Sequence, residues 1–246
     1  MNRHFVRVDP SSSPLESLLL DRLSAADLEL MTPMFEVWSA ESGNVLFEPG
    51  DPVDATYFPC KSTMASLRVI FEDGESVETA LIGREGAVGG IVSQGHLPAF
   101  TRAIIQQPGP LIRIQTSKLE EAKQQSTSIR NLFARYSDCL LSQVFQATAC
   151  NAAHSLEQRA AKWLLSALDH TTGSEVPLTQ EQLAGMLGVG RSYVNRVMRS
   201  WKHGGILEWR RGTLTIKNIS ALRERECACN RAVKEHFDTV LNGVYP

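Results

Sequence analysis

The sequence predicts an α+β fold in three parts: an N-terminal β-roll (jelly roll), a long helix and a C-terminal winged helix-turn-helix. Short apolar runs separated by glycine, proline and aspartate fill residues 35–115, a pattern typical of a sandwich or jelly-roll barrel. Apolar residues then step by three or four over residues 117–150, which indicates a long helix. Residues 178–216 combine two amphipathic segments, a glycine turn and an alternating hairpin, the pattern of a helix-turn-helix with a wing.

Residues 1–116 are predicted to hold an irregular arm and the β-roll. Residues 1–14 are polar and include a Ser-Ser-Ser-Pro run, so we expect a loose arm. A short helix is expected after Ser24, because serine is a favoured N-cap residue. The runs expected to form strands are 35–39, 44–48, 56–59, 64–71, 77–82, 101–107 and 111–115.

Residues 117–153 are predicted to form one long helix that ends in a hinge at 151–154. Ser117 and Glu120 have the spacing of a capping box at its start. Its apolar seam resembles that of a coiled coil, and a helix this long overruns a small barrel, so we expect a two-fold homodimer. Packing of the seam on the barrel of the same chain is the alternative. The expected interface residues are Ile129, Phe133, Tyr136, Leu140 and Val144.

Residues 154–246 are predicted to hold the winged helix-turn-helix and a closing helix. Thr179 and Gln182 form a capping box, and Gly188 tolerates the positive φ that ends the first helix of the motif. The second helix begins near Arg191. Residues 206–216 alternate around an Arg-Gly turn and are expected to form the wing, and residues 220–240 are expected to form the closing helix.

The outward face of the second helix is suited to duplex DNA. Arginine matches guanine edges and phosphates, and asparagine pairs with adenine. Helix-turn-helix proteins lay this helix in the major groove, whereas the alternative is a solvated helix with scattered arginines. We expect base contacts from Arg191, Ser192, Tyr193, Asn195 and Arg196. We expect contacts to the DNA backbone from Thr179, Gln180, Arg199, Lys202, Arg210 and Arg211.

The charge distribution agrees with DNA contact by one part of the chain only. The 246 residues, enough for two domains, carry a net charge of −2, so the whole chain is not a basic nucleic-acid binder. Residues 1–177 hold 14 Lys+Arg against 21 Asp+Glu, whereas residues 178–246 hold 11 against 6. The first residues lack a signal-peptide core, no apolar run reaches membrane-spanning length, and the five cysteines are an odd number. We therefore expect reduced thiols and a cytoplasmic location.

The order of these parts resembles the CRP/FNR family of bacterial transcription regulators. The local motifs are Tyr57-Phe58-Pro59, Asp73-Gly74, residues 83–89 and residues 178–207. The resemblance implies a homodimer whose cyclic-nucleotide-binding-like sensor domain controls two heads on a palindromic DNA operator, with RNA polymerase as a further partner. In many members an Arg-Glu pair starts the recognition helix and an arginine follows one turn later. Here Ser192 stands in place of the glutamate, so the family operator does not carry over.

The resemblance also implies where an effector would bind. Cyclic-nucleotide-binding members use a Gly-Glu pair and a later Arg-Ser/Thr pair, but here Ala87 follows Gly86 and Arg102 is out of register. We therefore expect that the β-roll does not bind cyclic AMP, and the small-molecule effector is unidentified. A constitutive regulator is a further alternative. The candidate pocket residues, with ordinary turn contacts as the alternative, are Arg84, Glu85, Thr101 and Arg102.

The sequence predicts no catalytic residue, no cofactor and no metal site. Iron–sulfur members use four cysteines, several near the N-terminus, but none here precedes Cys60. His96 is the only histidine in the β-part after the N-terminal arm, and the histidine triad of a cupin-like metalloenzyme is missing, so that function is a distant alternative. Cys227 and Cys229 would make a redox-responsive regulator if one thiol had a depressed pKa. Residues two apart on a helix point to different faces, which favours inert cysteines.

Overall fold

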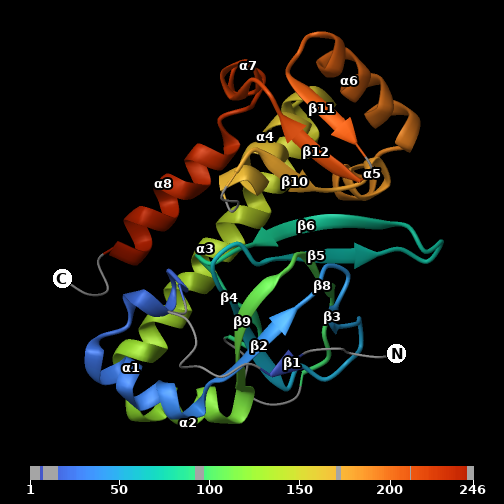
Figure 1. The fold of residues 1–246 in the computed structure, drawn as a ribbon. Coiled ribbons are helices and arrows are strands. Elements are labelled where there is room, and N and C mark those ends of the chain that lie inside the picture. The colour runs from blue at the N-terminus through green and yellow to red at the C-terminus, as the bar shows by residue number, and fades with distance from the viewer. Residues whose placement is uncertain (1–5, 8–15, 92–96, 170–172, 211, 243–246) are drawn as a thin grey trace.

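The computed structural model describes residues 6–7, 16–91, 97–169, 173–210 and 212–242, and structural statements below refer to these residues. It shows a β-roll, a long helix along it and a small helical head at the far end of that helix (Figure 1). A short helical segment follows the first two-residue strand of the β-roll and includes η2 (Leu20–Arg22), α1 (Ala25–Met31) and η3 (Thr32–Met34). Ser24 caps α1 as expected, since its hydroxyl accepts from the Asp27 N–H at 3.1 Å. No helix of the described residues is long and apolar enough to span a bilayer.

The β-roll consists of two antiparallel sheets. The first has the order β1 (Val6–Arg7), β2 (Glu36–Ala40), β9 (Gly109–Gln115), β4 (Ala55–Pro59) and β7 (Val88–Gly89). The second has the order β3 (Val45–Phe47), β8 (Arg102–Gln107), β5 (Met64–Ile70) and β6 (Ser76–Ile82). One apolar cluster joins residues of both sheets, including Leu46, Ile82, Ile105 and Leu111. All seven strands expected from the sequence are confirmed, whereas the two-residue strands β1 and β7 were not anticipated.

The predicted long helix is in fact two helices, α2 (Thr116–Gln125) and α3 (Thr127–Ala153). They are separated at Ser126, whose backbone is extended and whose hydroxyl caps α3 through the Ile129 N–H at 3.3 Å. The hydroxyls of Ser126 and Ser128 both donate to the Asp27 carboxylate. The expected capping box at Ser117 is wrong, because α2 begins one residue earlier and has no side-chain cap.

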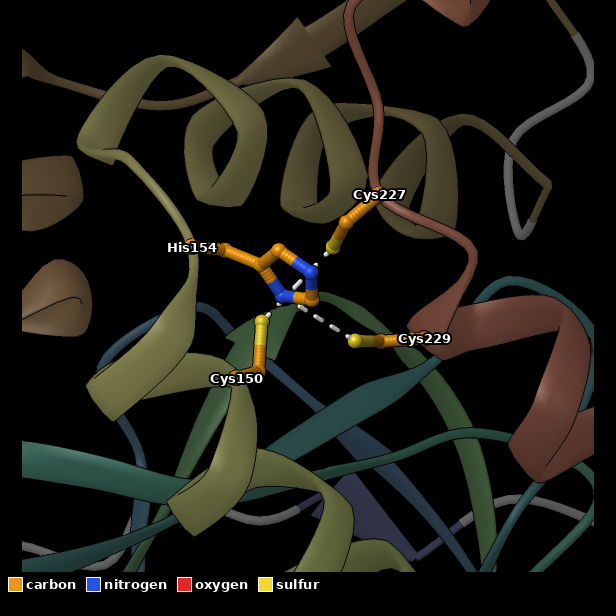
Figure 2. A group of neighbouring side chains, drawn as sticks. All are labelled: Cys150, His154, Cys227 and Cys229. Carbon is orange, nitrogen blue, oxygen red and sulfur yellow. Dashed lines mark hydrogen bonds between the residues drawn. The ribbon is translucent and has the colours of Figure 1, made fainter.

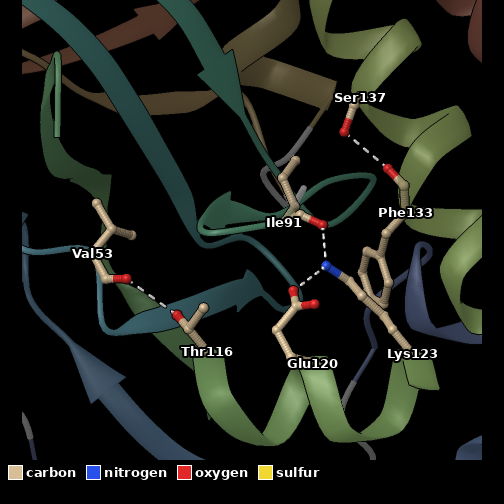
Figure 3. A network of polar contacts seen from close by, with 7 residues as sticks. All are labelled: Val53, Ile91, Thr116, Glu120, Lys123, Phe133 and Ser137. Carbon is tan, nitrogen blue, oxygen red and sulfur yellow. Dashed lines mark hydrogen bonds and ion pairs between the residues drawn. The ribbon is translucent and has the colours of Figure 1, made fainter. Parts of the chain in front are cut away.

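A buried lysine connects α2 to its surroundings (Figure 3). The Lys123 ammonium donates to the Ile91 carbonyl at 2.6 Å and to the Glu120 carboxylate at 2.7 Å. It also lies 5.9 Å from the centroid of the Phe133 ring. Thr116, at the start of α2, donates to the Val53 carbonyl at 3.2 Å. A buried ammonium is tolerated only with such partners, so Lys123 links α2, α3 and the chain after β7.

The inner face of α3 packs on the β-roll of its own chain. Ile129 and Phe133 are fully buried, Tyr136 is 1% exposed, and all three share a cluster with Phe58 and Ile114. The expectation that these three residues form a dimer interface is therefore wrong. Leu140 and Val144, the other two expected residues, are half-buried. An apolar helical seam does not specify which surface covers it, and the break at Ser126 allows α3 to run along the roll.

The segment between β6 and β7 contacts α3 through a hydrogen bond and close packing. The Tyr136 hydroxyl donates to the Ala87 carbonyl at 3.0 Å, and burial raises the pKa of this phenol. A Cβ atom added to Gly86 would lie 2.4 Å from that hydroxyl and 2.8 Å from a methyl group of Ile82. Because glycine has no side chain, the Tyr136 hydroxyl fits against Gly86.

The head has its own core and contains the expected winged helix-turn-helix. Its helices are α4 (Leu156–Asp169), α5 (Gln180–Leu187), α6 (Arg191–His203) and α7 (Ile219–Arg223). Its sheet has the order β10 (Glu175–Pro177), β12 (Thr213–Ile216) and β11 (Leu207–Arg210), of which β10 was not anticipated. Leu164, Leu183, Val194, Trp201 and Leu214 are buried together in its core. The expected hinge lies slightly later, because α3 continues to Ala153 and His154 is its C-cap.

The final helix leaves the head and returns along α3 (Figure 1). The expected helix over residues 220–240 is two helices, α7 and α8 (Cys229–Asn242). The rings of Tyr136 and Phe237 meet edge to face with centroids 6.3 Å apart, and Leu241 joins the cluster beneath α3. The C-terminal segment thus contacts the helix that carries the head.

Gly86→Ala should destabilise the protein, because the new methyl group overlaps the Tyr136 hydroxyl. We expect a loss of about 1–3 kcal/mol in the free energy of unfolding, measured by urea denaturation. Gly185→Ala is the matched control, since its Cβ meets nothing within 4 Å and alanine favours the helix α5 by about 0.5–1 kcal/mol. Equal stability of both variants would contradict the close packing at Gly86.

Candidate DNA-binding interface

The first helix of the motif, α5, is held at both ends by local hydrogen bonds. The Thr179 hydroxyl accepts from the Gln182 N–H at 3.1 Å, and the Gln182 side chain accepts from the Thr179 N–H at 2.7 Å. This confirms the predicted capping box. Gly188 ends the helix in the left-handed conformation with φ 63°, and the Val189 N–H then donates to the Ala184 carbonyl at 3.1 Å. The tight turn sets the start of α6.

One side of α6 is anchored in the head and the other is free. Val194, Met198 and Trp201 are at most 3% exposed. The Trp201 indole donates to the Glu157 carboxylate on α4 at 2.7 Å, so both packing and a hydrogen bond orient α6. The opposite side exposes the side chains of Arg191, Ser192, Tyr193, Arg196 and Arg199.

The N-terminus of α6 is open. Its N-cap is Gly190, which has no side chain to accept from the first N–H groups, and the first turn contains no acidic residue. Free N–H groups and the positive end of the helix dipole attract phosphate. The start of α6 therefore has the polarity that DNA contact requires.

The expected base-contacting residues lie on this start, with one difference in exposure. The Arg196 guanidinium lies 4.4 Å from the centroid of the Tyr193 ring, a cation–π contact that restricts the arginine. The sequence alone did not suggest that Tyr193 supports Arg196. Asn195 is half-buried, so it offers less surface to a base than its neighbours.

The expected backbone-contacting residues surround α6. Arg199 and Lys202 are exposed on the helix, and the Leu178 N–H donates to the Gly212 carbonyl at 2.9 Å, which joins the start of α5 to the wing. Arg210 is paired with Glu208 at 2.7 Å, and this ion pair lowers the pKa of the Glu208 carboxyl. Arg211 lies outside the described residues.

The comparisons agree with this geometry. Residues 158–225 match the Crp-like helix-turn-helix domain family. The chain is 25% identical over 226 residues to the global nitrogen regulator of Synechocystis, an alignment that covers 85% of this chain and 98% of that protein. The chain is a DNA-binding transcription regulator with a Crp-like helix-turn-helix domain, and over most of its length it is similar to CRP/FNR-type regulators.

Solved structures share the fold of the whole regulator. FixK2 from Bradyrhizobium japonicum superimposes with a TM-score of 0.66 at 15% identity, over 78% of this chain and 97% of that one. A putative CRP/FNR-family transcriptional regulator from Eubacterium rectale also gives 0.66, at 17% identity over 85% and 97% of the two chains. The expected combination of β-roll, long helix and winged head is thereby confirmed.

The residues expected to line an effector pocket of the regulator have separate partners. Arg102 pairs with Glu48 at 2.6 Å, and Glu85 accepts from the Gly83 N–H at 2.8 Å. Arg84 lies 3.9 Å from Glu16, and Thr101 is half-buried just before β8. These contacts match the alternative of ordinary turn and surface interactions. His96 lies outside the described residues.

The regulator's head rests on β6 through the half-buried carboxyl group of Glu78. Glu78 of β6 accepts from the Trp163 indole of α4 at 2.9 Å and from the Ser66 hydroxyl of β5 at 2.7 Å. Val77 contacts the turn after α5, because a Cβ on Gly188 would lie 3.1 Å from its methyl group. A cavity beside Glu78 lies between β6, α3, α4, α5 and α8. Sequence reasoning missed Glu78, since one glutamate in a strand carries no signal of burial.

The stability of the regulator should depend on the ionisation of Glu78. Burial raises the pKa of this carboxyl, although Arg68 and Lys162 act to lower it. A carboxyl with a raised folded-state pKa stabilises the fold below its unfolded pKa, and that stability is lost as pH rises through the folded pKa. Relative to Glu78→Gln, wild type should therefore gain melting temperature as pH falls from 8 to 4.5. A difference between the two melting temperatures that does not change with pH would contradict this assignment.

Proposed function

We propose that the protein is a homodimeric regulator that reads a specific DNA sequence with α6 and responds to a signal other than cyclic AMP. The observation that carries the DNA-reading proposal is the exposed arginine face of α6, which begins at an uncapped helix N-terminus and is anchored by Trp201. Arg191 and Arg196 are the principal base contacts, with Ser192, Tyr193 and Asn195 beside them. Thr179, Gln180, Arg199, Lys202, Arg210 and Arg211 contact phosphates. RNA polymerase is the expected protein partner.

Two contacts support the part of the proposal that excludes cyclic AMP. The Arg102 guanidinium is already paired with Glu48, and a buried cyclic phosphate needs such a cation for itself. Tyr136 fills the space at Gly86, in the segment where nucleotide-binding relatives of the resembled family hold the ribose. A constitutive regulator of the same fold is the alternative.

A thiol switch at Cys227 and Cys229 has less support. All five cysteines are buried, and burial raises the pKa of Cys227 to about 12. A neutral buried thiol reacts slowly with oxidants, because the thiolate is the nucleophile. A cupin-like metalloenzyme has no support either, since the one group of potential metal ligands in the described part of the chain lies outside the β-roll.

The proposed dimer uses the outward face of α3 instead of the buried seam. Leu141 and Phe145 are 49% and 64% exposed, one helical turn apart. They belong to an exposed stripe with the alternating spacing of a coiled coil: Ala134, Asp138, Leu141, Phe145, Thr148 and Ala152. Two copies joined along this outer stripe would bring two heads to one palindromic site.

The DNA-reading proposal is tested on an operator selected from random duplexes with the wild-type protein. Arg196→Ala should lose about 1–3 kcal/mol of discrimination at one base pair, because it removes a base contact. Lys202→Ala, the control, should weaken operator and scrambled DNA alike, since phosphates carry no sequence. Gel shifts on both duplexes measure the difference. Equal losses on both duplexes for Arg196→Ala would refute its role in base reading.

The outer stripe is tested by the mass of the full chain in solution. The double variant Leu141→Asp and Phe145→Asp should be a monomer in light scattering, because it buries two carboxylates in the proposed interface. Phe100→Asp is the matched control, as Phe100 is 83% exposed in the β-roll far from α3 in sequence. A double variant with the mass of a dimer would rule out this interface.

A further inference from the structure

Three cysteines and one histidine, which come from two distant parts of the sequence, lie together where α3 ends (Figure 2). Cys150 lies in the last turn of α3 and His154 is its C-cap. Cys227 lies in the connection between α7 and α8, and Cys229 is the first residue of α8. The thiol sulfurs and a ring nitrogen lie within 4.8 Å of one another. The expectation that Cys227 and Cys229 lie on different faces of one helix is wrong, because only Cys229 is helical.

Two of the distances between these atoms match the edges of a zinc tetrahedron, and the remaining ones do not exceed 4.8 Å. The sulfurs of Cys150 and Cys227 are 3.6 Å apart, and the Cys229 sulfur is 3.5 Å from the His154 Nδ1. Zinc bonds of ~2.3 Å to sulfur and ~2.0 Å to nitrogen give tetrahedral edges of about 3.8 Å and 3.6 Å. An iron–sulfur cluster distributes its cysteines over several irons and needs a wider set of ligands.

We propose that Cys150, His154, Cys227 and Cys229 bind one Zn²⁺ ion at the junction of α3 and α8. Three cysteines and one histidine form a complete tetrahedral set of the kind found in structural zinc sites. Binding forms three Zn–S bonds and one Zn–N bond, and the three thiols release their protons to solvent. His154 is half-buried, whereas the three cysteines are buried, so the ion has access on the histidine side.

The surroundings complement the charge of the proposed site. A zinc ion with three thiolates and a neutral imidazole carries a net charge of −1. The Lys162 ammonium lies 3.6 Å from the Cys150 sulfur, and the Gln146 amide donates to the Cys229 sulfur at 3.1 Å. The half-buried Arg159 also lies near Cys150 and Cys227: burial lowers the pKa of its guanidinium, and the two cysteines act in the opposite direction. Such outer donors orient and stabilise metal ligands.

The ion would connect α3 to α8 beside the start of α4, the first helix of the head. His154 and Ser155 connect α3 to α4, so an ion bound by Cys150, by His154 and by the two cysteines at the start of α8 would hold this connection and the end of α3 against α8. Arg159, beside the site, donates to the Leu187 carbonyl at 2.6 Å, at the end of α5. Asn230 of α8 donates to the Lys162 carbonyl of α4 at 3.0 Å. The zinc site would thus fix the hinge and, through Arg159, the turn of the DNA-reading motif.

Metal analysis of the full-length protein, purified under reducing conditions from zinc-supplemented cells, tests the proposal. We expect one zinc ion per chain in wild type and none in Cys227→Ser or Cys229→Ser. Cys60→Ala and Cys139→Ala are matched controls, because both cysteines are equally buried but lie outside the cluster, and they should retain zinc. Zinc retained by the serine variants, or stoichiometric iron with acid-labile sulfide in wild type, would overturn the proposal.

A second measurement avoids variants that fail to fold. Co²⁺ added to zinc-free wild type should give the intense visible bands of a tetrahedral site and thiolate-to-cobalt charge transfer. His154→Cys should retain these bands, because cysteine is also a ligand, whereas His154→Ala should shift them. Wild type that gives only the spectrum of hydrated cobalt, or that forms a Cys150–Cys227 disulfide under these reducing conditions, refutes the site.

Removal of zinc should lower the melting temperature, since the ion binds the folded state. This readout does not involve DNA, so it separates the metal proposal from the proposed function. Loss of sequence selectivity in a zinc-loaded protein would contradict the DNA-reading proposal alone.

Discussion

The arrangement of the whole chain depends on the burial of one face of α3 against its own β-roll. Ile129, Phe133 and Tyr136 each remove a large apolar surface from water, worth about 1.5–3 kcal/mol for a fully buried side chain. The helix is thereby held along the roll, and its remaining surface is divided between α8 and the exposed outer stripe. Because the seam is satisfied within one chain, any association between copies must use other residues.

The position of the DNA-reading head follows from two further contacts. Trp163 binds Glu78 of the β5–β6 hairpin, and Arg159 binds the carbonyl at the end of α5. Both residues lie on α4, so this helix transmits the placement of β6 and of the α3 terminus to the head. A rearrangement of β6 that moves Glu78 breaks the bond to Trp163 and releases one of these constraints. The structure thus contains a physical connection between the sheet that holds β5 and β6 and the head that holds α6.

Local sequence patterns predicted the structural features that are determined by residues close together in the sequence. Strand periodicity, the capping box at Thr179 and the glycine at 188 identified the main strands and the DNA-reading motif, because each signal lies within a few residues. Local patterns do not show which distant segment of the chain covers an apolar surface. The inner seam of α3 has the spacing of a coiled coil whichever surface covers it.

The cysteine cluster shows the same limit. Cys150 and His154 have a helical i, i+4 spacing that would have suggested a paired site. The Cys227 and Cys229 pair lies more than seventy residues later, and nothing local indicates that α8 returns to α3. The break between α7 and α8, which removes Cys227 from the helix, was also invisible in a segment of polar, amphipathic residues.

The ion pair between Arg210 and Glu208 affects how strongly salt weakens DNA binding. Each protein cation that meets a phosphate normally displaces a counterion condensed on the duplex, and the number displaced sets the slope of affinity against ionic strength. In the proposed DNA complex, Arg210 would start from an exposed ion pair with Glu208 of its own strand. It must exchange one anion for another, so the wing displaces fewer counterions than its arginine content implies. The affinity of this head for DNA would consequently fall less steeply with added salt than the number of its arginines suggests.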